Sequence, residues 1–361
     1  MTKRILSLDI LRGITVAGMI LVNNGYGESF STLCHSKWNG LTPCDLVFPF
    51  FLFIMGVSTY LSLSKSMFKP SGAVVMKIIR RTLALFLIGL FINWFELATK
   101  GDIMCFDHLR IWAVLQRIAI CYCIVSVIAL TVNHKWIIPM VLVLLAAYAV
   151  ILLTGNGYAE DASNIIARVD NCLFGADHLY HKSPVDPEGL LSTLPAVAHV
   201  LIGFYVGKKI HKADTVGYKA FNVLFIAAVL IVAGYLLSFG FPPNKRIWSP
   251  SYVLLTCGMA SALLGILMYC IDMRKSKRWY TFFQVFGVNP LFLYVTSEIL
   301  SVALKRIGVS EAVFGAVNSS VSHPQTASLI YAIYFVLLNY LIGYLLFKRK
   351  MYIKLDRKSV V

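Results

Sequence analysis

The chain has 361 residues, of which 58% are hydrophobic and 14% carry a formal charge. Soluble globular domains are less apolar and have about 25% charged residues, so the composition excludes an ordinary soluble enzyme. The net charge of +16 would suit nucleic-acid binding, but most basic residues lie in short segments that alternate with apolar blocks. That arrangement is typical of membrane topology, and we predict no nucleic-acid partner.

The apolar residues form blocks of about 20, the length of a helix that crosses a hydrocarbon core about 30 Å thick. Because backbone polar groups inside a bilayer must be satisfied within their own segment, each block is predicted to be a helix. We expect a single all-α transmembrane domain over residues 1–361, with about ten spans. The predicted spans are 5–24, 44–64, 80–98, 111–132, 136–154, 190–207, 219–238, 251–271, 282–303 and 327–347.

Lys and Arg residues between these spans concentrate on one side of the predicted bundle. With the N-terminus placed inside, the inner side holds the basic segments at 1–4, 65–81, 208–219, 274–278 and 348–358. The longest loop, between the fifth and sixth spans, falls on the outer side and is acidic. The positive-inside rule therefore predicts that both termini face the cytoplasm.

Two charged residues lie inside the first predicted span. Asp9 and Arg12 are three residues apart, so they share a helix face and can pair. Because charges are costly inside a membrane and often functional, Arg12 either anchors the helix through a salt bridge or contributes to ligand binding. The eight cysteines fit no zinc-binding spacing, and we predict no metal site.

The densest polar segment lies between the first two spans, from Asn23 to Asp45. Thr42 and Pro43 are typical of a helix start, which places Asp45 in the first turn of the second helix. His35 lies ten residues earlier, in a loop that could fold back over it. A His–Asp pair is a common general base because the carboxylate fixes the imidazole tautomer. Alternatively, His35 is a surface residue and Asp45 only stabilises the helix N-terminus.

Other polar residues interrupt later blocks. Gln116 and Arg117 lie in the fourth span, where they either face a cavity or bond neighbouring helices. Glu188 precedes the sixth span, where it either stabilises a helix N-terminus or contacts a ligand. Asn289 and Pro290 predict a broken ninth helix that lines a cavity or is buried in protein. Broken helices and intramembrane charges also suit a transporter.

Short runs along nearly the whole chain form a recognisable pattern. They are SLDILRG at 7–13, VNNG at 22–25, WNGLT at 38–42, DLVFPF at 45–50, FIMG at 53–56, VLQRI at 114–118, DPEGLL at 186–191, NK at 244–245, WSPSY at 248–252 and NPL at 289–291. The pattern resembles that of the heparan-α-glucosaminide N-acetyltransferase family, including its bacterial relatives. The resemblance covers the membrane core, and we expect the large lumenal N-terminal extension of the lysosomal enzymes to be absent.

The resemblance implies transfer of an acetyl group from cytoplasmic acetyl-CoA, the co-substrate, to the amine of a glucosamine-type sugar on the outer face. It also implies a bacterial cytoplasmic (inner) membrane location and a homodimer. By position in the motif, His35 matches the catalytic histidine of the family. Asn24 matches an asparagine beside it, and Asp45 matches the carboxylate that follows the Trp-Asn-Gly run.

His35 is expected to act either as a base in a ternary complex or as a transiently acetylated nucleophile, with Asn24 as hydrogen-bond donor to the developing oxyanion. The candidate residues for binding CoA are Asn24, Arg12, Arg80, Arg81, Gln116 and Arg117, although topology alone also explains Arg80 and Arg81. The candidate residues for binding the acceptor are Trp38, Asn39, Asp186 and Glu188. The alternative functions are a sugar or anion transporter and a membrane O-acetyltransferase.

Overall fold

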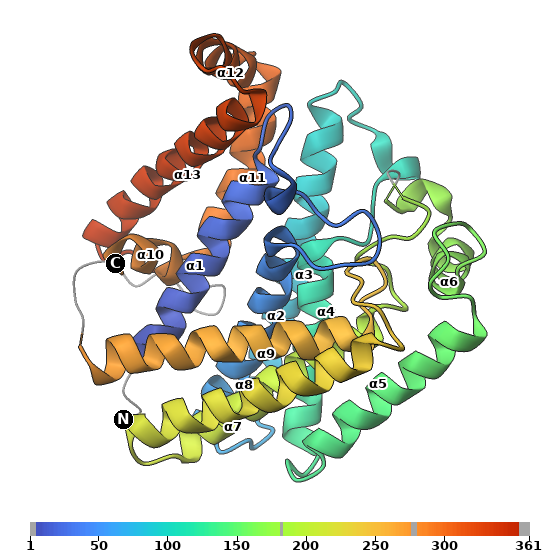
Figure 1. Cartoon of the computed structure of the whole chain (residues 1–361), viewed down its shortest axis with the longest axis vertical. Coiled ribbons are helices and arrows are strands. Elements are labelled where there is room, and N and C mark those ends of the chain that lie inside the picture. Colours follow the sequence, from blue (N-terminus) through green and yellow to red (C-terminus); the bar gives the residue numbers. More distant parts are fainter. Residues whose placement is uncertain (1–4, 181–182, 276–279, 354–361) are drawn as a thin grey trace.

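The computed structural model describes residues 5–180, 183–275 and 280–353. Every regular element in these ranges is helical, and no strand occurs among them. The prediction of an all-α fold is confirmed, and each of the ten predicted blocks contains a helix (Figure 1). Parts of the basic segments that orient the chain, at 1–4, 276–279 and 354–361, lie outside the described residues.

Within the described residues, eleven helices occupy the ten predicted blocks: nine blocks contain one helix each, and the broken block contains two. They are α1 (Leu6–Asn23), α2 (Val47–Leu63), α3 (Gly72–Ala98), α4 (Val114–Thr131), α5 (Ile137–Thr154), α7 (Thr193–Lys212), α8 (Val216–Ser238), α9 (Pro250–Leu267), the pair α10 (Thr281–Val288) and α11 (Pro290–Arg306), and α13 (Pro324–Lys348). Helix α3 begins earlier than the predicted span because the Ser71 hydroxyl caps it by accepting from the Val74 N–H. Arg80 and Arg81 therefore lie inside this helix.

Two further helices, α6 (Ile165–Phe174) and α12 (Val309–Ser320), lie outside the predicted spans. Short helical turns complete the fold: η1 (Ser31–Leu33), η2 (Pro43–Leu46), η3 (Ser64–Ser66), η4 (Cys105–His108), η5 (Ala176–His178) and a π-helical turn (Met268–Met273) that extends α9. The break predicted at Asn289 and Pro290 is confirmed, because α10 and α11 meet at an angle of 86°. Asn289 fixes the break by donating to the carbonyl of Met351 and accepting from the N–H of Ile353.

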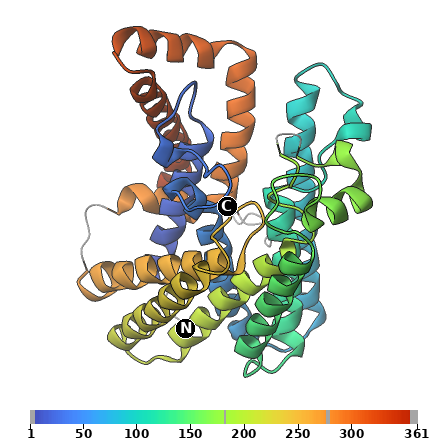
Figure 2. The ribbon, with the colours of Figure 1, turned by 45° about the vertical axis from the view of Figure 1, so that its right-hand side comes forward.

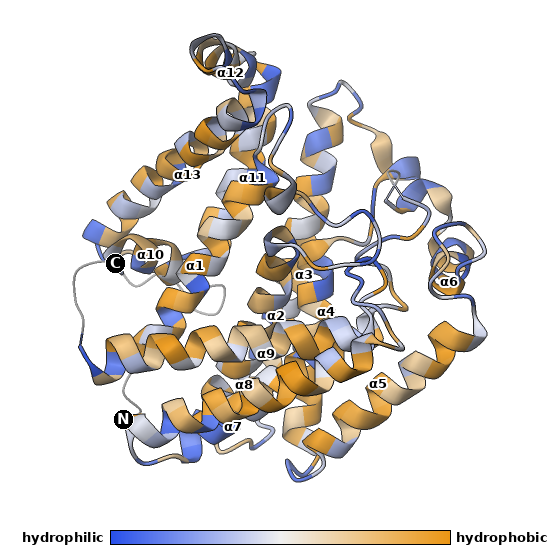
Figure 3. Ribbon diagram, viewed as in Figure 1, coloured by the Kyte–Doolittle hydropathy of each residue, from blue (hydrophilic) through white to orange (hydrophobic). Residues whose placement is uncertain are grey.

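Long apolar helices dominate the structure (Figure 3). Within the described ranges, seven helices are long and apolar enough to cross a membrane, and the bent pair α10–α11 adds an eighth if it is counted as one span. Because such helices are stable in a bilayer and would expose large apolar surfaces to water, the chain is an integral membrane protein with many spans.

Glycines allow the central helices to approach closely. A Cβ atom at Gly56 of α2 or at Gly203 of α7 would overlap a backbone carbonyl of the other helix. The same holds for Gly13 of α1 and Gly287 of α10. Small residues at such crossings are typical of helix packing in membranes. The contacts fix α1 and α2, the two helices joined by the polar segment that contains His35.

The helices are arranged with α3–α6 on one side and α10–α13 on the other (Figure 2). The loop at 24–46 reaches from α1 toward the loops at 155–164 and 239–249. Two hydrogen bonds fix it there, from Gly40 N to the Pro243 carbonyl (2.8 Å) and from Trp38 Nε1 to the Tyr158 carbonyl (3.0 Å). We call this end of the bundle, which also carries the loop at 99–113, the loop face.

Candidate active site

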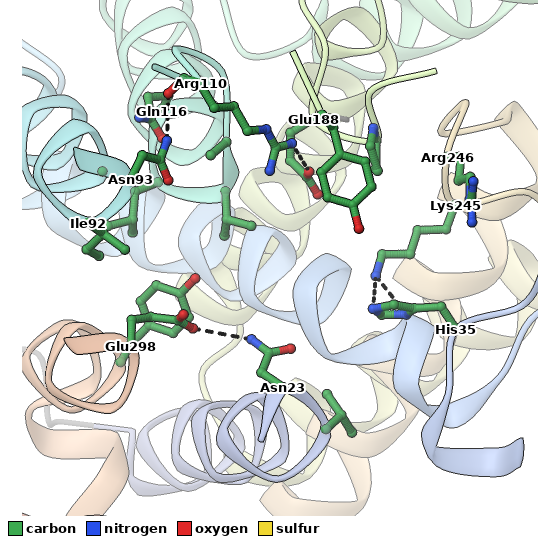
Figure 4. A pocket seen from close by; sticks show the side chains of 18 of the residues that line it. Asn23, His35, Ile92, Asn93, Arg110, Gln116, Glu188, Lys245, Arg246 and Glu298 are labelled. Carbon is green, nitrogen blue, oxygen red and sulfur yellow. Dashed lines mark hydrogen bonds and ion pairs between the residues drawn. The ribbon is translucent and has the colours of Figure 1, made fainter. Parts of the chain in front are cut away.

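A cavity of about 570 Å³ lies at the loop face, within the size range of small-molecule sites. Its walls come from the ends of α1, α3 and α4, from the first half of α11 and from the surrounding loops (Figure 4). Charged and titratable side chains reach it from every wall. They include His35, Asp45, Arg110, Glu188, Lys245 and Glu298.

His35 and Asp45 are in direct contact in this cavity, so their predicted proximity is confirmed. The imidazole Nδ1 lies 2.7 Å from Asp45 Oδ1. The Asp45 side chain is fully buried, whereas 49% of the His35 side chain is exposed. The sulfur of buried Cys44 also packs 3.2 Å from Nδ1. The carboxylate therefore holds one edge of a ring whose other edge is accessible from the cavity.

The second oxygen of the Asp45 carboxylate fixes the loop that carries His35. Oδ2 accepts hydrogen bonds from Ser36 N (3.1 Å), Thr42 N (3.2 Å) and Thr42 Oγ1 (2.9 Å). Thr42 is the N-cap of the turn before α2, as predicted. The Tyr252 hydroxyl donates to the backbone carbonyl of Asp45 at 2.7 Å. Asp45 thus stabilises the helix start and orients His35 at the same time.

Lys245 completes the cluster and is one of the site residues that the sequence did not indicate. Its ammonium nitrogen lies 3.0 Å from His35 Nδ1, 3.2 Å from Nε2 and 3.8 Å from Asp45 Oδ1 (Figure 4). Only 13% of the Lys245 side chain is exposed, and burial lowers the pKa of its amine. The Asn-Lys run at 244–245 was the available signal, but nothing in it points to His35.

Asp186 and Glu188, both predicted to bind the acceptor, form a cluster with Arg110. The guanidinium reaches Asp186 Oδ1 at 2.6 Å and Glu188 Oε2 at 2.9 Å. Burial raises the pKa of Asp186. Burial also opposes ionisation of Glu188, but Arg110 holds the pKa of Glu188 below its usual value. Glu188 lines the cavity and Asp186 does not, so only the Glu188 carboxylate of this cluster is available to a molecule bound there.

Trp38 and Asn39, the other candidates for the acceptor site, do not line the cavity within the described ranges. The indole N–H of Trp38 bonds to the Tyr158 carbonyl. Asn39 Oδ1 accepts from Asn244 Nδ2 at 3.1 Å. Because Asn244 precedes Lys245 in the chain, Asn39 connects the loop of His35 to the loop of Lys245. Both residues hold the loops that build the site.

Asn24 does not reach the cavity either. Its side chain is buried, and Nδ2 donates to the Ile20 carbonyl of the same helix at 2.8 Å. Its neighbour Asn23 lines the cavity instead and lies 3.4 Å from Glu298 Oε1. The structure therefore does not place Asn24 where it could stabilise an oxyanion beside His35.

The candidate CoA-binding residues on α3 and α4 are dispersed. Gln116 lines the cavity. Arg117 is fully buried, and its guanidinium donates to the Gly189 carbonyl at 2.7 Å and to the Ser192 hydroxyl, which fixes the loop before α7. The Arg81 guanidinium lies over the Tyr122 ring. Arg80 is exposed on the same helix.

Arg12 lines a second cavity of about 480 Å³ at the opposite end of α1. The predicted pair is confirmed, because Arg12 Nη1 lies 3.0 Å from Asp9 Oδ1. Further cations line this cavity, which we call the basic cavity. They are Lys65 and Lys219, together with the titratable His211. Ten residues of α1 separate Arg12 from Val22 in the first cavity, a rise of about 15 Å.

These features define a many-spanning membrane protein with a histidine, a carboxylate and a lysine at one cavity and a basic cavity at the opposite end. Residues 4–234 match the model of the heparan-alpha-glucosaminide N-acetyltransferase catalytic family, and the chain belongs to that family. His35 and Asp45 lie within the matched segment, whereas Lys245 and Glu298 follow its end.

Two curated relatives have the name heparan-alpha-glucosaminide N-acetyltransferase. The protein of Homo sapiens is 29% identical in an alignment that covers 82% of this chain and 53% of the relative. The protein of Mus musculus is 28% identical in an alignment that covers 82% of this chain and 54% of the relative. The chain therefore spans about half the length of the curated relatives it matches.

Proposed function

We propose that the protein is a transmembrane N-acetyltransferase that moves the acetyl group of acetyl-CoA to the amine of a glucosamine-type sugar. One observation carries the proposal. In a chain of the heparan-alpha-glucosaminide N-acetyltransferase family, His35 is oriented by a buried carboxylate at 2.7 Å and faces a cavity large enough for a small sugar. This is the arrangement that a general base needs in order to accept a proton from an amine.

The chemistry follows from the two edges of the imidazole. Asp45 accepts a hydrogen bond from Nδ1–H, which leaves the unprotonated Nε2 to take a proton from the acceptor amine. The amine nitrogen then forms a bond to the thioester carbonyl carbon, and the bond from that carbon to sulfur breaks. The thiolate of CoA leaves and receives the proton from His35. Protons and charges balance, and His35 returns to its initial state.

Lys245 is suited to the negative charge that develops on the carbonyl oxygen in this step. Its ammonium lies beside the imidazole edge that receives the proton and is largely shielded from water. A preorganised cation in such a place stabilises an oxyanion strongly. We assign Lys245 the role for which the sequence suggested Asn24, whose side chain bonds to its own helix.

The basic cavity supports acetyl-CoA as the donor, because its cations suit the phosphates of the nucleotide. A pantetheine arm that follows α1 over about 15 Å would bring the thioester to His35. By the positive-inside rule the basic cavity faces the cytoplasm and the loop face lies outside. This orientation puts both termini in the cytoplasm. The family resemblance, and not the charge distribution, is the reason to propose a bacterial inner membrane and a homodimer.

Transport is the second candidate, favoured by two cavities at opposite ends of α1 and by the sharp break between α10 and α11. Purified protein in proteoliposomes separates the two functions. With labelled acetyl-CoA on the side of the basic cavity and glucosamine on the other, we expect labelled N-acetylglucosamine. Entry of unmodified glucosamine without acetylated product would instead identify a transporter.

The same assay with N-acetylglucosamine as acceptor tests the attacking atom. This sugar retains its hydroxyls but has no free amine. We expect no transfer to it. Transfer to both sugars at similar rates would identify an O-acetyltransferase.

A further inference from the structure

The cavity wall across from His35 and Lys245 carries a separate group of polar side chains (Figure 4). Asn23 comes from the last turn of α1, Gln116 from the first turn of α4 and Glu298 from the middle of α11. The catalytic chemistry proposed above uses none of them. Because all three line the cavity, they are available to contact a part of the substrate other than the reacting amine.

Glu298 is a carboxylate within a helix of the membrane bundle. Its hydrogen bond from Asn23 is long, at 3.4 Å to Oε1. An ionised carboxylate has acceptor sites for several hydrogen bonds, and charged residues at membrane depth usually face a cavity and serve a function. Tyr294, one turn earlier on α11, also hydrogen-bonds to this carboxyl group. Glu298 lines the cavity, and its two oxygens have acceptor sites beyond these two bonds for a bound molecule.

Gln116 gives an independent indication of a ligand. The residue is fully buried, yet neither its amide oxygen nor its amide nitrogen has a partner within the described part of the chain. Gly89 lies against this amide, where a Cβ atom would overlap it, so the position of the side chain is tightly defined. Buried polar groups are almost always hydrogen-bonded in proteins. An amide that is fixed at a cavity wall in this way can both donate to and accept from a ligand.

We propose, on the basis of the function proposed above, that Glu298, Gln116 and Asn23 form the sugar subsite of the acceptor and hold the ring hydroxyls of an aminohexose. A hydroxyl donates one hydrogen bond and accepts others, so the hydroxyls spread around a sugar ring suit a wall that carries one carboxyl group and two amides. The ring then lies against this wall while its amine faces His35.

The test uses the full chain and two acceptor amines. Glucosamine has the hydroxyls, and cyclohexylamine has a ring of the same size without them. We expect Glu298→Gln to weaken glucosamine binding and to raise the KM for glucosamine by about tenfold or more, as expected for losing a hydrogen bond to a charged group. Transfer to cyclohexylamine and the KM for acetyl-CoA remain unchanged. Glu160→Gln, at an exposed carboxylate of a loop, is the matched control.

Calorimetric binding of glucosamine separates this proposal from the proposed function. Glucosamine binding that depends on Glu298, without acetyl transfer, supports the subsite and refutes the acetyltransferase. Acetyl transfer with an unchanged KM in Glu298→Gln overturns the subsite and leaves the acetyltransferase. An equal loss for both amines, or a raised KM for acetyl-CoA, also overturns the subsite. Gln116→Met should also raise the KM for glucosamine and leave transfer to cyclohexylamine unchanged. Agreement between the two variants excludes a folding defect of one of them as the cause.

Discussion

Replacing Lys245 by methionine removes the ammonium from the site and keeps a side chain of similar length. At the observed 3.8 Å from Asp45 Oδ1, the lost attraction is about 4 kcal/mol for an effective dielectric constant of about 20. The loss of a preorganised donor to the oxyanion is expected to lower kcat by about 10²–10³-fold. Lys245→Arg keeps the charge and is expected to retain more activity than Lys245→Met.

The assay is acetyl transfer from acetyl-CoA to glucosamine over a range of pH. Burial lowers the pKa of Lys245, so its ammonium loses its proton at a lower pH than an ordinary lysine. As pH rises, wild-type activity should therefore begin to decrease before the pH at which an ordinary lysine titrates. Lys245→Arg should move this alkaline limit upward. Lys37→Met, at an exposed lysine of the loop that carries His35, is the control. Wild-type kcat in folded Lys245→Met would refute the assigned role.

Three further predictions concern the orientation of His35, the pH dependence of stability and the packing of α2 against α7. Asp45→Asn should lower kcat on the order of 10³–10⁴-fold because an amide no longer fixes the His35 tautomer; unchanged kcat would remove Asp45 from the mechanism. Asp170 is buried in α6 and accepts a hydrogen bond from Leu190 N. Burial raises the pKa of Asp170 from 3.8 to about 6, so its ionisation opposes folding, and the free energy of unfolding should decrease by about 3 kcal/mol as pH rises through this interval. Thermal unfolding of Asp170→Asn should lack this decrease, and an identical pH profile would contradict the assignment. Gly203→Ala should lower the melting temperature through overlap with α2, whereas Gly240→Ala, with open space around it, should not; equal melting temperatures would argue against the close crossing.

The spans could be predicted because hydropathy is a local property of the sequence. Each apolar block became helical, and the break at Asn289–Pro290 could be read from two residues. Helices α6 and α12 could not be predicted in this way, because helices of 10 and 12 residues are too short to give the hydropathy signal of a membrane span. The early start of α3 depends on the cap at Ser71, which precedes a basic segment that hydropathy assigns to a loop.

The site was predictable where its residues are close in sequence. His35 and Asp45 are ten residues apart, and the helix start at Thr42 defines the turn between them. Lys245 is 210 residues from His35, and Glu298 is 275 residues from Asn23. Contacts over such separations depend on how the helices pack, which no local pattern encodes. Adjacent helical residues differ in direction by about 100°, which is why Asn23 faces the cavity while Asn24 does not.

The most direct test of the central claim is acetyl transfer from labelled acetyl-CoA to glucosamine by purified wild-type and His35→Ala protein. Binding of CoA and thermal unfolding show whether the variant is folded. We predict transfer by the wild type and its loss in a folded variant that still binds CoA. Equal transfer by both proteins would contradict the account, because it would remove His35 from the chemistry.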